Sequence, residues 1–423
     1  MTRRRIRRAV PLCVLSAGPL AGLLPCATSV AHAQTGHVQT GHVQTGHVHT
    51  GHVQTGHVQT GHVHTGTAPA RPERAPSGDE VALGPGLPTG HLRTDASLSD
   101  VAGLSARDVW AVGQQEAWDF WRNRGVITHW DGSSWGEVPI RGDATGAGHL
   151  RSVAAASPGE VWAVGDGHDG LPYLAKGSAD GFDRVSVPRL RTGDWLGGIA
   201  ASSGRVAAVG SRDGQVFLLS SGGAGKGAVW KTGQGPGGAL YGVALAGRSD
   251  GWAVGDSGDG PLAMRLAGGG WKRADLPRIK GGFLRDVYAE SRKRAVAIGG
   301  VYRDGKISPL VLDWDGRRWK RAKPPERHAE LYGVTGDGEG VFWISGYDPA
   351  RAAEGFLLRY DGSRWTRLRG QASGANRKVR LQAVTHVGGL TMAVGHVLNG
   401  RDGKERYTDL VERFGPSHAL AAR

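Results

Sequence analysis

The sequence predicts an all-β fold, a seven-bladed β-propeller with four-stranded blades that follows a disordered N-terminal tract. A strand motif ending in glycine recurs seven times, with its terminal glycines 52, 45, 45, 44, 47 and 49 residues apart. A period of about 40 to 50 residues with several short strands in each repeat is typical of propellers. Glycine makes up 71 of 423 residues, which suits a chain that reverses direction several times in every repeat.

The first 33 residues read as a secretory signal peptide. A basic start is followed by an apolar stretch and by Ala31-His32-Ala33, so we expect cleavage before Gln34. Both the general and the twin-arginine export routes stay open. Cys13 and Cys26 leave with the signal, so the mature chain has no cysteine, and its formal charge falls from +14 to +9 because five arginines are lost. We expect a secreted protein, associated with the cell wall or free, with no transmembrane segment in the mature chain.

Residues 34–66 repeat the pentapeptide QTGHV. Gly, Thr and Gln cannot build a core, so this tract is predicted to be disordered. One hypothesis is that neutral imidazoles on the mobile chain bind Zn, Cu or Ni, and the alternative is a spacer that spread by replication slippage. The histidines that would bind the metal are His37, His42, His47, His52, His57 and His62. A Pro-rich linker follows at 67–78.

The propeller is predicted over 79–416, with a C-terminal tail at 417–423. The first strands contain Val101, Val153, Ile199, Val243, Val287, Val334 and Val384. The second strands lie at 109–113, 161–165, 206–210, 251–255, 295–299, 342–346 and 391–395. Third and fourth strands form hairpins around Asp-Gly turns, as at 129–135, 313–319 and 359–365. Repeat seven lacks its fourth strand, so we expect 80–88 to complete that blade and close the ring.

The pattern of apolar strand, glycine, loop, apolar strand and Trp/Tyr-Asp-Gly-x-x-Trp resembles kelch repeats and the related propeller of galactose oxidase. It also looks like the DVWAVG-type repeats of secreted bacterial propellers. The kelch double glycine occurs only at Gly299-Gly300, and Trp130-Asp131 is similar to WD repeats without their Gly-His partner. Galactose-oxidase chemistry is excluded because that family needs a cysteine joined to its copper-binding tyrosine. The resemblance therefore implies the fold and no activity.

Variable loops after each second strand are the predicted binding positions. The first loop carries Trp118, Asp119, Phe120, Trp121 and Arg122, whose aromatic rings could stack on sugars while the polar groups bind hydroxyls. Alternatively the three aromatics fold back as a lid on blade 1. Later loops add His168, Tyr302, Tyr347 and His396 as ligand candidates. Aspartates of these loops could bind Ca²⁺ at the channel, although most belong to Asp-Gly turn signals.

The repeated tryptophans of the second strands, in contrast, are predicted to fill the wedges between blades. They are Trp110, Trp162, Trp252 and Trp343.

Positive charge is concentrated in residues 271–380, which hold 24 Lys and Arg against 13 Asp and Glu. This sector is predicted to form a basic flank on blades 4 to 6. It could attract an anionic polymer, or it could protect exposed strand edges from pairing with other chains. Nucleic acid is not favoured, because no aromatic residues are interleaved with the basic ones.

Our leading functional hypothesis is a secreted, monomeric, non-enzymatic binding module without a cofactor. Its partner would be a cell-surface glycan, an anionic wall polymer or a protein. One alternative is an extracellular carbohydrate-active enzyme, a hydrolase or lyase, with carboxylates at the channel mouth. The other alternative is metal capture by the His-rich tract, with the propeller as its tether.

Overall fold

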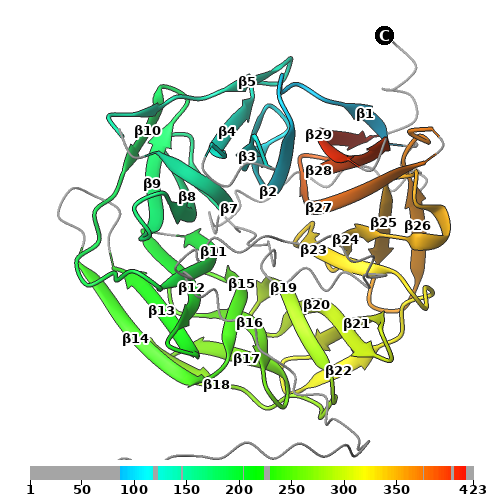
Figure 1. Ribbon diagram of the computed structural model, residues 1–423. Coiled ribbons are helices and arrows are strands. Elements are labelled where there is room, and N and C mark those ends of the chain that lie inside the picture. The colour runs from blue at the N-terminus through cyan, green and yellow to red at the C-terminus, as the bar shows by residue number, and fades with distance from the viewer. Residues whose placement is uncertain are drawn as a thin grey trace, which may run out of the picture. The chain divides into compact units, whose positions relative to one another are not determined.

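Seven sheets, antiparallel except for one added edge strand, form a closed ring, as the sequence predicts (Figure 1). The computed structural model describes residues 86–117, 122–143, 146–202, 204–222, 229–374, 376–401 and 404–415, with only the backbone of 401, 404 and 405. The whole ring falls within one of the two units into which the chain divides. The predicted signal peptide, His-rich tract, linker and C-terminal tail all lie outside the described residues, as do residues 79–85 of the predicted propeller. No helix among the described residues is both long and apolar enough to cross a membrane.

Four strands of each blade run from the inner to the outer edge, in chain order except in blade 7, whose outer strand comes from the start of the described chain. Blade 1 comprises β2 (Ala96–Ser105), β3 (Asp108–Gln115), β4 (Arg124–Trp130) and β5 (Trp135–Glu137). Blade 2 comprises β7 (Ala147–Ser157), β8 (Glu160–Gly167), β9 (Pro172–Ser178) and β10 (Gly181–Arg184). Blade 3 comprises β11 (Trp195–Ser202), β12 (Arg205–Arg212), β13 (Gln215–Ser221) and β14 (Trp230–Gly237). Blade 4 comprises β15 (Ala239–Leu245), β16 (Gly251–Ser257), β17 (Gly260–Ala267) and β18 (Gly270–Arg273). Blade 5 comprises β19 (Gly282–Ser291), β20 (Arg294–Arg303), β21 (Lys306–Trp314) and β22 (Trp319–Ala322). Blade 6 comprises β23 (Glu330–Gly336), β24 (Phe342–Tyr347), β25 (Phe356–Tyr360) and β26 (Trp365–Arg369). Blade 7 comprises β27 (Arg377–Val387), β28 (Leu390–Arg401), β29 (Lys404–Phe414) and β1 (Leu87–Thr89).

The ring closes by the predicted N-terminal strand. β1 pairs antiparallel with β29, with Leu87 opposite Arg413 and Thr89 opposite Val411. Figure 1 shows β1 and β29, from opposite ends of the described chain, side by side. Closure removes the open edge that the last blade would otherwise present.

Blade 2 differs from the expected four strands. The connection from blade 1 forms a short strand, β6 (Ile140–Arg141), which pairs parallel with β10 on the outer edge. An ion pair of 2.6 Å between Arg141 Nη2 and Asp183 Oδ2 supports this contact. The motif spacing carries no sign of this strand because it lies between two repeats.

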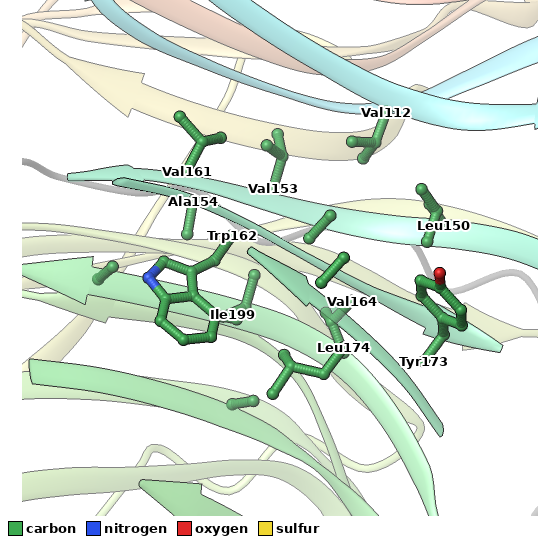
Figure 2. Packing of buried hydrophobic residues seen from close by; sticks show 14 of the residues in the cluster. Val112, Leu150, Val153, Ala154, Val161, Trp162, Val164, Tyr173, Leu174 and Ile199 are labelled. Carbon is green, nitrogen blue, oxygen red and sulfur yellow. The ribbon is translucent and has the colours of Figure 1, made fainter. Parts of the chain in front are cut away.

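Tryptophans of the second strands fill the wedges between blades, which confirms their predicted core role. Trp110 and Trp252 are fully buried, and Trp252 meets Trp319 of blade 5 edge-on at 4.8 Å. Trp162 packs in the same way on Trp230 of blade 3, at 5.8 Å. Figure 2 shows Trp162 beside Ile199 of the neighbouring blade. Burial of each such tryptophan stabilises the folded propeller by roughly 2–3 kcal/mol. The tryptophans therefore contribute several kcal/mol at each blade interface where two of them meet.

Buried side chains on the inner strands join neighbouring blades. Asp100 of blade 1 accepts a hydrogen bond of 2.9 Å from Val153 N–H of blade 2, and Asp286 of blade 5 accepts one of 2.8 Å from Val334 N–H of blade 6. Burial raises the pKa of both carboxyl groups well above the usual range, against the effect of these hydrogen bonds. The aspartates therefore act as structural links between blades.

Candidate functional site

The predicted loop of blade 1 is only partly described. Trp118, Asp119, Phe120 and Trp121 lie outside the described residues, while Arg122 is exposed in the turn that follows them. The next residue, Asn123, lies 3.0 Å through Oδ1 from Nε2 of His168, an exposed residue of the blade 2 loop. The loops that follow the second strands of blades 1 and 2 are therefore in contact, because both lie at the same end of the ring.

The other loop candidates are separated by the structure. Tyr302 is 44% exposed on blade 5. Tyr347 and His396 are buried, and each contacts an inner strand: Tyr347 lies under Arg380 at 4.7 Å, and His396 Nδ1 lies 2.8 Å from Ser97 Oγ. These two residues support the channel mouth and are not free loop side chains.

A β-bulge near the start of every inner strand builds the channel mouth, which is the end of the ring where inner strands begin and second strands end. In each blade the inner strand contains a Leu-x-x-Val/Ile segment, and one residue of this segment is skipped in the pairing with the second strand. The extra residues are Ser99, Arg151, Gly197, Tyr241, Arg285, Tyr332 and Gln382. A bulge re-aims the side chain of its extra residue. We call these seven residues the bulge ring.

Contacts pass from blade to blade through the first half of the bulge ring. Ser99 Oγ lies 2.9 Å from Nε2 of His149 on blade 2. The guanidinium of Arg151 lies over the ring of Trp195 on blade 3 at 5.5 Å. Trp195 meets Tyr241 of blade 4 edge-on at 5.7 Å. Cation–π and edge-to-face contacts therefore follow one another around the mouth.

The second half continues the same chemistry. Arg285 lies over the ring of Tyr332 on blade 6 at 4.7 Å and over its own blade's Phe283 at 5.4 Å. Arg380 of blade 7 donates from Nη1 to the hydroxyl of Tyr332 at 2.7 Å, and Tyr332 donates to Glu330 at 2.6 Å. Burial raises the pKa of Tyr332, which keeps its hydroxyl a neutral donor.

One arginine of the bulge ring has unused donors. The side chain of Arg151 is 6% exposed and pairs with Asp166 through Nη2. Its Nε and Nη1 are buried and have no hydrogen-bond partner among the described residues. Buried donors without acceptors are costly, and a charged donor more so. An incoming carboxylate or phosphate oxygen would satisfy them.

Three carboxylates of the mouth are each held by a neighbouring donor. Asp166 pairs with Arg151, Glu330 accepts from Tyr332, and Asp256 accepts from the Tyr241 hydroxyl. Burial raises the pKa of Asp256, although this hydrogen bond lowers it. Within the described part of the chain, no three His, Cys, Asp or Glu side chains gather as a metal site requires. The histidines of the predicted metal tract lie outside that part.

Sequence reasoning missed the bulge ring. It assigned ligand binding to the loops after the second strands, whereas the described aromatic and cationic side chains gather on the inner strands. A signal was present, because the residue after the leucine in each Leu-x-x-Val/Ile segment varies among Ser, Arg, Gly, Tyr and Gln, whereas the residue after it is only Asp, Ser, Gly or Ala.

Comparison with known proteins supports the fold. Neither protein-family models nor curated proteins yield a match to this chain. Among solved structures, YCF48 bound to D1 peptide aligns with a TM-score of 0.52 at 15% identity, over 78% of this chain and 97% of that one. The structure of U3-55K aligns with a TM-score of 0.53 at 12% identity, over 78% and 99%. A GH74 xyloglucanase from Xanthomonas campestris aligns with a TM-score of 0.51 at 13% identity, over 75% and 54%. At these identities the likeness shows the propeller fold alone.

Proposed function

We propose that this chain is a non-enzymatic binding propeller whose channel mouth takes an acidic peptide segment of a partner protein. The observation that carries the proposal is the alternation of arginines and aromatic rings around the mouth, with Arg151, Arg285 and Arg380 contributed by three different blades. Arginine binds carboxylates with several donors in fixed geometry, and aromatic rings supply contact area at small entropic cost.

The unpartnered donors of Arg151 favour an anionic ligand. Trp195, which is half-buried beside this guanidinium, would contact the ligand's backbone or an apolar side chain. A carboxylate side chain that enters the mouth would accept from Nε or Nη1 and would remove the cost of leaving them buried and unpaired. A neutral sugar offers no charge for this position, so an acidic peptide suits it better.

The fold likeness admits both a binding and an enzymatic role, since YCF48 is seen with a peptide and the xyloglucanase is a glycoside hydrolase. The mouth itself favours binding. Glycoside hydrolysis needs one carboxyl group free to donate a proton and another free to act as nucleophile or base. Here Asp166, Asp256 and Glu330 are already engaged by Arg or Tyr.

We further propose that the protein is exported and acts outside the cell. The signal-like N-terminus and the resemblance of the repeats to kelch-type and secreted bacterial propellers support this location. A glycan or an anionic wall polymer remains the alternative partner. N-terminal sequencing of protein from culture medium tests export, and a chain that begins at Gln34 is the expected result.

Peptide binding is tested by fluorescence anisotropy with a library of Asp- and Glu-rich peptides and composition-matched neutral peptides. Wild type should prefer the acidic set. Arg285→Ala should weaken binding by about ten- to a hundredfold, the worth of one charge-assisted hydrogen bond. The matched control Arg364→Ala changes an exposed arginine of the β25–β26 turn, outside the mouth, and should bind as wild type does. Equal affinities for all three proteins, or turnover of a polysaccharide by wild type, would contradict the proposal.

A further inference from the structure

A groove of about 390 Å³ lies between blades 4 and 5. It is formed by β17, β18 and the β21–β22 turn. Because β16 ends and β17 begins at the channel mouth, with Ser257 opposite Gly260, the far end of β17 lies at the other end of the ring. The groove is therefore separate from the bulge ring. The cationic residues that line it are Arg265, Lys272, Arg273, Arg317 and Arg318, against one acid, Asp275.

The rim of the groove carries charge without partners. Lys272 and Arg273 on β18 and Arg317 and Arg318 in the turn are exposed, and none of the four forms an ion pair within the described residues. Nearby cations differ in this respect, since Lys320 Nζ pairs with Asp315 at 2.6 Å. Four unpaired cations that face one concave surface create a positive potential that concentrates anions there.

The floor of the groove has buried donors that lack acceptors. In blade 1, Nε1 of Trp110 donates to Asp108 two residues earlier, at 2.7 Å. In blade 4 the equivalent acid, Asp250, lies instead 3.3 Å from Arg265 Nη2 and 3.1 Å from Arg292 Nε. Nε1 of the fully buried Trp252 and Nε of Arg265 are left without a partner among the described residues. Both belong to residues that line the groove.

The floor also selects against ligands that bind by stacking. The guanidinium of Arg265 lies over the rings of Trp252 at 5.2 Å and Trp314 at 5.1 Å. Both rings are buried, with 0% and 7% of their surface exposed. A sugar ring or a nucleobase therefore finds no open aromatic face, and recognition has to depend on charge and hydrogen bonding.

We propose that this groove binds a linear polymer of phosphate groups. Successive phosphates would lie between the β18 and turn cations, since arginine and lysine both suit phosphate oxygens. One phosphate oxygen would reach the donors of the floor. This gives the basic sector of the sequence a defined site, and it is independent of peptide binding at the channel mouth.

The test is calorimetric titration of the full chain with inorganic polyphosphate at pH 8, where the many histidines of the N-terminal tract are mostly neutral. Wild type should bind, and binding should weaken as salt rises. The double variant Lys272→Glu/Arg317→Glu should bind at least about tenfold more weakly, since two attractions become repulsions. The matched control Lys280→Glu/Arg278→Glu makes the same charge change at exposed positions outside the groove and should lose little.

Further arms separate this proposal from its rivals. The mouth variant Arg285→Ala should bind polyphosphate as wild type does. Equal losses in the groove and control variants would overturn the groove assignment, as would loss on Arg285→Ala alone. Tighter binding of polyglutamate, of a single-stranded oligonucleotide or of vesicles rich in anionic lipid would overturn the choice of a phosphate polymer. Equal melting temperatures of all variants confirm that each is folded.

Discussion

Glu412 on β29 is a buried carboxyl group at the point of ring closure. It is 0% exposed, and neither of its carboxylate oxygens has a hydrogen-bond partner among the described residues. Three glycines enclose it: a Cβ at Gly86 would lie 2.7 Å from Oε2, and one at Gly355 or Gly370 would clash more severely. Burial raises the pKa of Glu412 to about 8.

The effect on stability follows from this shift. The pKa rises from 4.5 to about 8, which at ~1.36 kcal/mol for each unit corresponds to at most about 5 kcal/mol. The folded form keeps its proton over a range in which the unfolded chain releases it. The stabilisation is therefore complete below about pH 4.5 and is lost as the pH rises towards 8.

The variant Glu412→Gln removes the titration and keeps the shape. Urea unfolding of both proteins between pH 4 and pH 9 should show similar free energies at the acid end, where both side chains are neutral. By pH 9 the variant should be more stable than wild type by up to about 5 kcal/mol. Other groups titrate alike in both proteins, so the difference isolates Glu412.

The control is Glu339→Gln, at an exposed position, which should leave the pH dependence of wild type unchanged. If the curves of wild type and Glu412→Gln run parallel across this range, the carboxyl group is not held neutral by the fold. The reasoning from burial would then be refuted.

Three further predictions concern the ring. Asp286→Ala should lower the free energy of unfolding by about 1–3 kcal/mol, because Val334 N–H loses its acceptor; unchanged urea unfolding would contradict this. Gly355→Ala should cost about as much, because its Cβ would overlap the Glu412 carboxylate, and a melting temperature equal to wild type would count against it. Deleting residues 79–90 removes β1 and should lower the melting temperature by at least a few degrees; no shift would disprove closure by this strand.

Much of the architecture could be predicted because it depends on short sequence motifs that recur in every repeat. Each second strand contains a glycine whose Cβ would collide with the neighbouring inner strand, as at Gly113 against Ser97, although the strands continue past this residue. Asp-Gly pairs adopt positive φ as expected, with Asp213 and Asp304 both at 51°. These glycines and turns have the same structural role in every repeat, so their spacing in the sequence was enough to count the blades.

The candidate site could not be predicted because it depends on register and on contacts across blades. Nothing in the sequence shows that Arg285 meets Tyr332, 47 residues later, or that Arg380 donates to the same tyrosine. The skipped residue in each inner strand shifts side chains between faces, which a plain alternation pattern does not reveal.

The basic flank was predicted only in outline. Several of its cations prove to be ion-paired, as Arg292 is with Asp250 at 3.1 Å. Others gather at one groove, where Lys272 and Arg317 come from adjacent blades. Glu412 was equally hidden, because the glycines that enclose its carboxyl group, Gly86, Gly355 and Gly370, come from segments far from it in the chain.

The central claim, that the channel mouth is the binding surface, is tested most directly by hydrogen–deuterium exchange of the chain with and without a bound acidic peptide. We expect slower exchange at the inner-strand segments that carry Arg151, Arg285 and Tyr332, and unchanged exchange at the β18 and β22 edges. Unchanged exchange at the mouth, with protection confined to other surfaces, would contradict the account.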